Sequence, residues 1–265
     1  MFVDSHCHLT FPELRERIDA IRADMAAARV DRALVICTTL EEFADVHAVA
    51  LRYDNFWASA GVHPDNEDVE EPTVERLTTL ASLPRVVGIG ETGLDYYRLG
   101  ERTLEQMEWQ RERFRTHIRT ARQVSKPLIV HTRSASDDTL AILREEGAER
   151  AGGVFHCFTE TMAVARAALD LGFMVSFSGI LTFRNAEDLR EVARFVPLDR
   201  CLIETDSPYL APVPYRGKVN NPSFVPHVAA MVAQVKALSV EQVAAATSAN
   251  FERLFALPPM NRSLQ

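Results

Sequence analysis

The chain has 265 residues, a length that suits one large α/β domain or two small ones. Its composition, 47% hydrophobic and 25% charged, excludes a disordered or fibrous protein. The formal net charge of −8 excludes the broad basic face of proteins that coat nucleic acid without specificity.

Short apolar runs alternate along the chain with longer amphipathic segments. The apolar runs are hydrophobic on both faces, which predicts buried parallel strands at residues 2–4, 33–37, 56–60, 86–89, 128–131, 153–155, 174–177 and 201–204. The amphipathic segments predict helices at residues 12–29, 41–52, 73–81, 103–124, 136–146, 162–171, 186–195, 226–238 and 240–255. Ser239 is the expected N-cap of the last helix, with Gln242 completing a capping box.

Eight strands that alternate with helices predict an α/β fold of the (β/α)8, or TIM-barrel, type. The alternative is a doubly wound open sheet, which usually has fewer strands and a glycine-rich phosphate loop that this sequence lacks. The chain shows no internal repeat or linker, so we expect residues 1–265 to form a single domain.

Two histidines follow the first predicted strand. His6 and His8 are two residues apart, so an extended chain points both toward one face, where they can bind one divalent metal ion. Cys7 between them points the other way, and Cys157 beside His156 does the same, so packing is the favoured interpretation for both thiols. With no C-x-x-C pair, we expect reduced cysteines.

Further polar residues follow four of the later strands. Glu91 lies among glycines after the fourth strand, where a carboxylate can bridge two metal ions; the alternative is a helix-capping or surface glutamate. His131 and His156 follow the fifth and sixth strands, and each is either a ligand or a buried structural histidine. Asp206 follows the eighth strand, where it can bind a metal ion and accept a proton from the attacking water. Glu204, two residues earlier, either orients a ligand histidine or forms a buried ion pair.

Active sites of barrel enzymes lie at the carboxyl ends of the strands, so we expect these side chains to meet. The predicted ligands are His6, His8, Glu91, His131, His156 and Asp206. They suit two divalent ions, with nitrogen and oxygen donors that favour Zn, Mn, Co or Ni, and Mg less well.

A second group of residues at the predicted barrel mouth is suited to a phosphorylated substrate. His63 follows the third strand, and Arg133, Arg216 and Lys218 supply cations; the alternatives are a loop histidine without a role and a solvated basic loop. Aromatic residues that can stack nucleobases are Trp109, Tyr96, Phe158, Phe183 and Tyr209, although core packing is more common for each of them.

Eight segments, taken together and in order, resemble the TatD-like metal-dependent deoxyribonucleases of the amidohydrolase superfamily. They are DSHCHL at 4–9, GVHP at 61–64, GIGETGLDYY at 88–97, KPLIVHTRSA at 126–135, FHCF at 155–158, SFSGILTF at 176–183, ETDSPYLAP at 204–212 and YRGKVNNPSFVPHVA at 215–229.

The resemblance implies a TIM barrel with two metal ions. One ion would be held by His6, His8, Glu91 and Asp206, and the other by Glu91, His131 and His156, with Glu91 and Asp206 as catalytic residues and Asp206 as general base. His63, Arg133, Arg216 and Lys218 would contact substrate.

The same resemblance implies 3′→5′ exonuclease activity on DNA. The sequence has no basic helix and no RNA-binding motif that would read a double strand, so we expect single-stranded ends of DNA or RNA as the substrate. The alternative is an ester hydrolase, such as a D-aminoacyl-tRNA deacylase, or a small-molecule amidohydrolase on the same two-metal site. A non-catalytic metal-binding protein is the third hypothesis. The sequence begins without a secretion signal and has no run of about 18 apolar residues, so we expect a cytoplasmic protein, favoured to be monomeric, without membrane contact.

Overall fold

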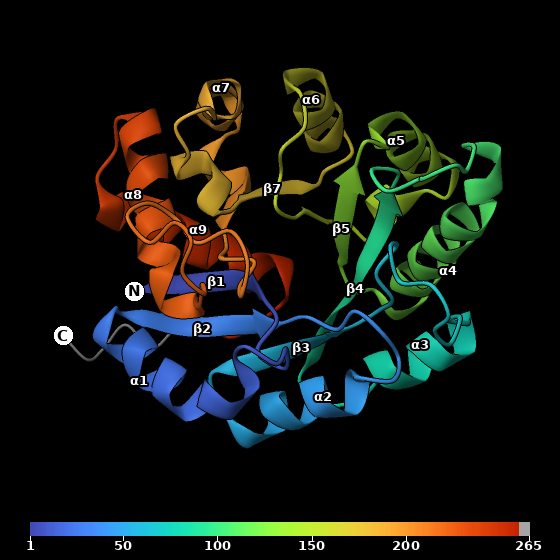
Figure 1. The fold of residues 1–265 in the computed structure, drawn as a ribbon, viewed down its shortest axis with the longest axis horizontal. Helices are drawn as coiled ribbons and strands as arrows, with labels where there is room; N and C mark the ends of the chain where they lie inside the picture. The colour runs from blue at the N-terminus through green and yellow to red at the C-terminus, as the bar shows by residue number, and fades with distance from the viewer. Residues whose placement is uncertain (260–265) are drawn as a thin grey trace.

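Eight parallel strands form one sheet in the computed structural model, which describes residues 1–259 (Figure 1). The strands follow each other around the sheet in sequence order. They are β1 Phe2–Cys7, β2 Val30–Val35, β3 Phe56–Ala60, β4 Val86–Asp95, β5 Leu128–Arg133, β6 Gly153–Phe155, β7 Met174–Phe177 and β8 Cys201–Ile203. Cys7 at the end of β1 forms a parallel bridge with Ser207, which follows β8, so the sheet curls into the predicted (β/α)8 barrel. The last six residues of the predicted domain lie outside the described residues.

Helices surround the sheet and return the chain from the end of each strand to the start of the next (Figure 1). They are α1 Ile18–Ala27, α2 Phe43–Arg52, α3 Val74–Ala81, α4 Glu108–Val124, α5 Ser136–Glu145, α6 Met162–Asp170, α7 Glu187–Phe195, α8 Val225–Lys236 and α9 Val240–Leu254. The predicted capping box of Ser239 and Gln242 is confirmed at the start of α9. Within the described part of the chain, no single helix is long and apolar enough to cross a membrane, although the bent pair Pro222–Lys236 and Val240–Leu254 passes this test when taken together.

Two helices begin five or more residues later than the sequence predicts. The segment predicted as a helix over residues 12–29 starts with the 3-10 turn Arg15–Arg17, and α1 itself begins at Ile18. The segment predicted over 103–124 likewise starts with the 3-10 turn Glu105–Met107 before α4. In both cases the first residues of the predicted amphipathic helix belong instead to the connection between the preceding strand and the helix.

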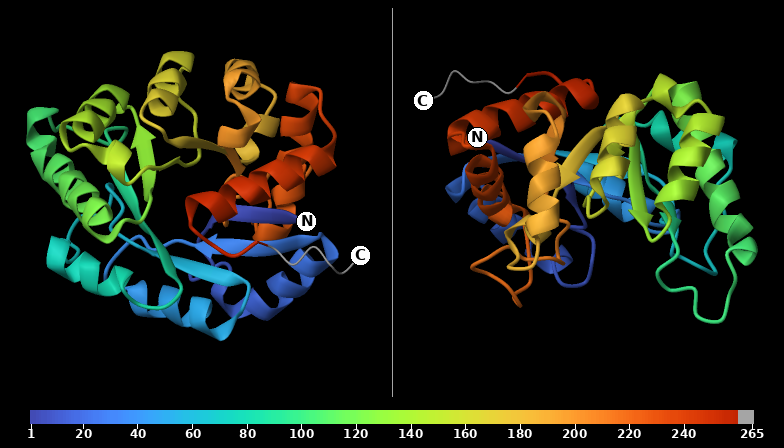
Figure 2. Two further views of the ribbon diagram at one scale, coloured as in Figure 1. Left: turned by 180° about the vertical axis from the view of Figure 1, so that it is seen from behind. Right: turned by 90° about the horizontal axis from the view of Figure 1, so that it is seen from above.

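The barrel interior is apolar near the starts of the strands. Val3, Leu34 and Leu202 belong to a buried cluster with Phe251 of α9 and with Phe255, which directly follows this helix. Seen from behind, α9 lies across the sheet beside the N-terminus (Figure 2). The helix therefore closes this end of the barrel, and buried polar side chains collect toward the carboxyl ends of the strands.

Strand β4 is six residues longer than the sequence predicts. The predicted strand ended at Ile89 because the residues that follow are small or polar, but the observed strand continues to Asp95. Its second half pairs with β5 through Gly93 and His131 among others. Because side chains alternate along a strand, the extension places Glu91 and Asp95 on the same face.

Candidate metal centre

Glu91 lies at the centre of the polar cluster, and its side chain is only 3% exposed. Its Oε2 atom is 3.3 Å from His6 Nε2 and 3.8 Å from His8 Nε2. Its Oε1 atom is 2.8 Å from His156 Nε2 and 3.3 Å from His131 Nδ1. The two oxygens of one carboxylate therefore face two separate pairs of imidazoles.

Asp206 adds a second carboxylate on the His6–His8 side. Its Oδ1 atom lies 3.4 Å from His8 Nε2 and 3.6 Å from His6 Nε2. The backbone N–H of Asp206 donates to the His6 carbonyl at 2.9 Å, so the ends of β1 and β8 fix these side chains together. The side chain of Asp206 is 14% exposed, against 3% for Glu91, which places it closer to solvent.

The local backbone lets β4 lie unusually close to β5. Gly93 has a φ of +130°, and a Cβ atom there would lie 1.9 Å from the His131 carbonyl oxygen. Gly90 has a φ of +150°, and its Cβ would lie 2.7 Å from the Ile129 carbonyl oxygen. Only glycine fits both positions, which explains why the residues around Glu91 are small.

Two carboxylates bind the outer nitrogens of the histidines that face Glu91 Oε1. Asp95 Oδ2 lies 3.0 Å from His131 Nε2. Glu204 Oε1 lies 3.3 Å from His156 Nδ1 and accepts a hydrogen bond from the Cys157 N–H at 2.7 Å. Such contacts fix the orientation and tautomer of an imidazole ring. The structure thus places Glu204 against a candidate ligand histidine.

Sequence reasoning missed Asp95 and Asp4. Asp95 could have been predicted by extending the fourth strand four residues beyond Glu91, because side chains alternate between the two faces of a strand. Asp4 is fully buried, and its carboxylate accepts hydrogen bonds from the Thr205 N–H at 2.9 Å and the Thr205 hydroxyl at 2.5 Å, so it ties β1 to β8. Burial raises the pKa of Asp4 to about 8, although these hydrogen bonds oppose the shift. Its signal in the sequence was an acidic residue within an apolar run.

The charges of the cluster keep its central carboxylates ionised. Burial acts to raise the pKa of Glu91, but the charges of His156, His63 and His6 hold it well below its usual range. Burial also acts to raise the pKa of Asp206, and the neighbouring histidines again lower it below its ordinary value. Both carboxylates therefore carry negative charge near neutral pH.

The donor atoms fit divalent metal ions. His156 Nε2 is buried and has no hydrogen-bond partner among the described residues, although it points to Glu91 Oε1. His6 Nε2 and His8 Nε2 lie only 3.3 Å apart, and the ligand atoms of His6, His8 and Glu91 all lie within 4.8 Å of one another. Imidazole nitrogens that converge on carboxylate oxygens are the donors that Zn, Mn, Co and Ni prefer.

The two thiols beside the centre have other contacts. Cys7 Sγ donates to the Leu34 carbonyl at 3.3 Å, and Cys157 Sγ lies 3.2 Å from the Ser178 hydroxyl. These contacts agree with the packing roles expected from strand alternation.

His63 lies closer to the centre than its predicted role in substrate contact required. Its Nε2 atom is 3.3 Å from Glu91 Oε1, and its ring meets the His131 ring edge-on with centroids 4.6 Å apart. Its position is fixed from α4, since Arg113 Nη1 donates to the His63 carbonyl at 3.0 Å and His117 Nε2 accepts from the neighbouring backbone N–H of Val62. His63, Glu91 and His131 form a further group that could hold a metal ion.

The predicted cationic residues separate into two kinds. Arg133 is the last residue of β5, and its guanidinium lies 3.6 Å over the ring of Tyr97. Arg216 and Lys218 are exposed on the connection after β8. Their cations lie over aromatic rings, at 3.6 Å from the centroid of Phe183 for Arg216, rather than against the six ligand candidates. Arg133 lies opposite Asp95 in the pairing of β4 with β5, beside the centre, whereas Arg216 and Lys218 lie on the outer loop.

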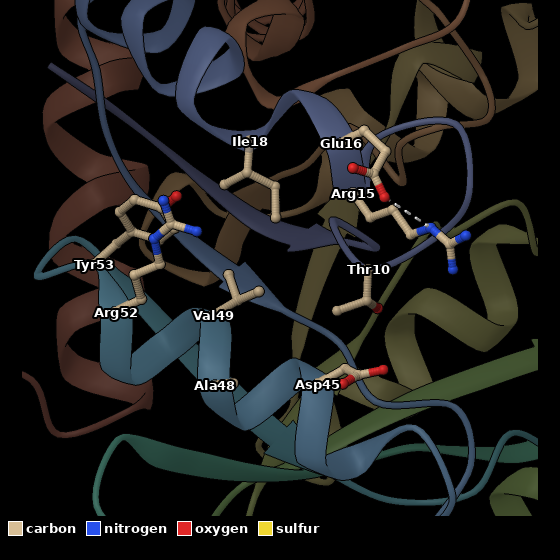
Figure 3. Close-up of a pocket in the computed structure, with 9 residues that line it drawn as sticks. All are labelled: Thr10, Arg15, Glu16, Ile18, Asp45, Ala48, Val49, Arg52 and Tyr53. Atoms are coloured by element: carbon tan, nitrogen blue, oxygen red, sulfur yellow. Dashed lines mark ion pairs between the residues drawn. The ribbon is translucent and has the colours of Figure 1, made fainter.

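A pocket of about 370 Å³ lies outside the barrel, beside α2 (Figure 3). Its lining combines an apolar floor, including Ile18 and Val49, with charges of both signs. Arg15 and Glu16 form an ion pair of 3.6 Å at its edge. None of the predicted site residues lines this pocket.

The fold and the cluster at its strand ends define a class of proteins, the TIM-barrel hydrolases that depend on metal ions. The comparison with protein families identifies the particular member of that class. A family model described as TatD related DNase matches residues 3–256, and the chain belongs to this family. It is thus a metal-dependent hydrolase of the TatD family.

Relatives support the same assignment. The chain is 50% identical to the uncharacterized metal-dependent hydrolase YcfH of Escherichia coli K12, over 96% of this chain and 95% of that protein. It is 34% identical to the 3'-5' ssDNA/RNA exonuclease TatD of Citrobacter rodentium, over 96% and 97%. Among solved structures, the TatD homolog YJJV of Escherichia coli K12 has a TM-score of 0.88 and 29% identity, with 97% and 98% of the two chains covered.

Proposed function

We propose that the protein is a divalent-metal-dependent nuclease that hydrolyses phosphodiester bonds at the 3′ ends of single-stranded DNA or RNA. The observation that carries this proposal is the position of Glu91, because one of its carboxylate oxygens faces His6 and His8 while the other faces His131 and His156. A carboxylate in that position suits two adjacent ions, the arrangement of many enzymes that cleave phosphodiesters. The relative from Citrobacter rodentium, named as an exonuclease, supports the choice of substrate.

One divalent ion would lie on each side of the Glu91 carboxylate. His6, His8, Asp206 and Glu91 Oε2 would hold one, and His131, His156 and Glu91 Oε1 the other. When bound, such ions activate a water molecule and neutralise charge on the phosphate. Zn, Mn, Co or Ni fit the nitrogen-rich donor set better than Mg.

The remaining chemistry belongs to side chains of the chain itself. Asp206 is ionised and closer to solvent than Glu91, and these two properties support a role in which its carboxylate would accept the proton of the attacking water. Arg133 at the rim would bind a non-bridging phosphate oxygen. Arg216 and Lys218 on the outer loop would contact phosphates farther along the strand. His63 beside Glu91 would contact the leaving group or complete the second ion's ligands.

Digestion of an end-labelled single-stranded oligonucleotide tests the proposal. The wild-type protein should shorten the strand stepwise from its 3′ end, and EDTA, His6→Ala or Asp206→Asn should abolish cleavage. His47→Ala is the matched control, because the His47 ring contacts the Pro84 carbonyl on the outside of the barrel.

Two outcomes would contradict the nuclease proposal. Hydrolysis of aminoacyl-tRNA or simple esters without cleavage of the oligonucleotide would show an ester hydrolase on the same centre. If the fully metal-loaded protein hydrolyses neither the oligonucleotide nor the esters, it would be a non-catalytic metal-binding protein.

A further inference from the structure

Two tyrosines are exposed beside the centre although large aromatic side chains are usually buried. Tyr97 follows β4 and is 61% exposed, and Tyr209 follows β8 and is 53% exposed. By contrast, two of the aromatics considered as base-stacking candidates from the sequence, Tyr96 and Phe158, are buried. From this contrast, and resting on the proposed nuclease function, we infer that Tyr97 and Tyr209 stack the nucleobases on the two sides of the scissile phosphate.

Tyr209 is held firmly by its backbone while its ring remains open. Its N–H donates to the Asp206 carbonyl at 3.1 Å, which fixes its distance from the centre. Its own carbonyl accepts from Asn220 Nδ2 at 2.7 Å. Asn220 is fully buried, and the same amide group donates to the Thr205 carbonyl at 2.9 Å. A buried polar side chain thus sets the position of an aromatic ring that contributes little to the core.

The ring of Tyr209 lies near the His8 side of the centre and contacts it through Phe11. Phe11 stacks on the His8 ring with centroids 4.6 Å apart and planes inclined by 21°. Tyr209 meets Phe11 edge-on, with centroids 6.2 Å apart. A base between these rings and solvent would lie beside the side chains proposed to hold the first metal ion.

Tyr97 occupies the corresponding place on the His131 side. Its N–H donates to Asp95 Oδ1 at 2.9 Å, and the other oxygen of that carboxylate lies 3.0 Å from His131 Nε2. The guanidinium of Arg133 covers one face of the ring at 3.6 Å. The pair therefore offers a planar surface and a phosphate-binding cation at a single position.

The two tyrosines belong to loops on opposite sides of one barrel end. Figure 2 shows the loop after β4 and the connection after β8 projecting from the same end, away from α9. The backbone of each tyrosine is joined to a different half of the centre, because the Tyr209 N–H donates to the Asp206 carbonyl and the Tyr97 N–H donates to the Asp95 carboxylate. A phosphate at the centre would thus have one aromatic surface on each side.

Stacking of this kind defines a class of substrate. Base–aromatic stacking tolerates any base sequence, because each base presents a π-face, but it requires bases free of a paired strand. The subsites would therefore take unpaired terminal nucleotides and bind DNA and RNA alike.

The test uses Tyr97→Ala and Tyr209→Ala with their phenylalanine counterparts, and Leu51→Ala on α2 as an equally exposed control. Substrates are an end-labelled oligonucleotide, the same strand with one abasic residue on either side of the scissile bond, and the base-free diester bis(p-nitrophenyl) phosphate. In each alanine variant, the ratio of kcat/KM on the oligonucleotide to that on the base-free diester should fall roughly tenfold or more. The phenylalanine variants should restore this ratio.

The abasic strands locate each contact. Removal of one base should lower the cleavage rate of the wild-type protein. For each abasic strand, this decrease should be absent in the alanine variant of the tyrosine that stacks the missing base, and it should remain in the other alanine variant. Equal costs in the wild-type protein and both variants, or an unchanged ratio in both alanine variants, would overturn the inference.

Oligonucleotide binding, measured by fluorescence anisotropy in the metal-free protein, separates this result from failure of the proposed function. Binding that depends on the tyrosines without cleavage would overturn the nuclease proposal alone. Cleavage that is indifferent to both tyrosines would overturn the stacking inference alone.

Discussion

Replacement of Asp95 by asparagine should weaken the metal centre without removing a predicted ligand. The carboxylate of Asp95 is 3% exposed and lies 3.0 Å from His131 Nε2, while the other nitrogen of that ring faces Glu91. Asparagine keeps the shape of the side chain and can still accept the Tyr97 N–H through its oxygen. It removes the charge that fixes His131, and a hydrogen bond to a charged group contributes about 1.5–3 kcal/mol.

This energy corresponds to a loss of roughly tenfold to hundredfold in metal affinity, the range typical for partners of ligand histidines. Competition with a chromophoric chelator, using Zn²⁺ and the metal-free protein, measures the dissociation constants directly. Asp138→Asn is the control, because that carboxylate accepts a hydrogen bond from the Tyr96 hydroxyl at 2.7 Å on the outside of the centre. A folded Asp95→Asn protein with wild-type metal affinity would refute a positioning role for Asp95.

Three further changes test how the fold supports the site. Gly93→Ala places a Cβ atom 1.9 Å from the His131 carbonyl oxygen. The free energy of unfolding, measured with urea, should therefore fall by at least about 2 kcal/mol. Burial lowers the pKa of His117 to about 4, so its contribution to stability is present above pH 6.5 and is lost as the pH falls toward 4. The free energy of unfolding should therefore be about 2 kcal/mol lower at pH 5 than at pH 7.5. This difference should be smaller in the His117→Gln variant. Asn220→Ala leaves the carbonyls of Thr205 and Tyr209 without their donor and should cost about 1–3 kcal/mol in the same assay.

Three short and mostly apolar strands could be predicted from the sequence with their observed bounds. β3, β6 and β7 have the predicted bounds, because a buried parallel strand is a short run that is hydrophobic on both faces. β4 could not be bounded in this way. Its second half is made of glycine, threonine and acidic residues, and it remains a strand because its backbone pairs with β5.

The innermost residues of the site were predictable for a related reason. A histidine or carboxylate directly after an apolar run stands at the carboxyl end of a barrel strand, so Glu91 and Asp206 could be expected to meet although 115 residues separate them in the chain. The supporting contacts follow no such pattern. The position of His63 depends on Arg113 and His117, which lie about 50 residues later on α4, and no local signal links these residues.

Metal content per chain tests the central claim most directly. If Glu91 joins two ions, activity of the metal-free protein on a phosphodiester should return only as two equivalents of metal are added. Elemental analysis of the active protein should then find two ions per chain, and Glu91→Gln, shown to be folded by circular dichroism, should bind fewer. Full activity with one ion per chain, or two ions and a wild-type rate in Glu91→Gln, would contradict the account.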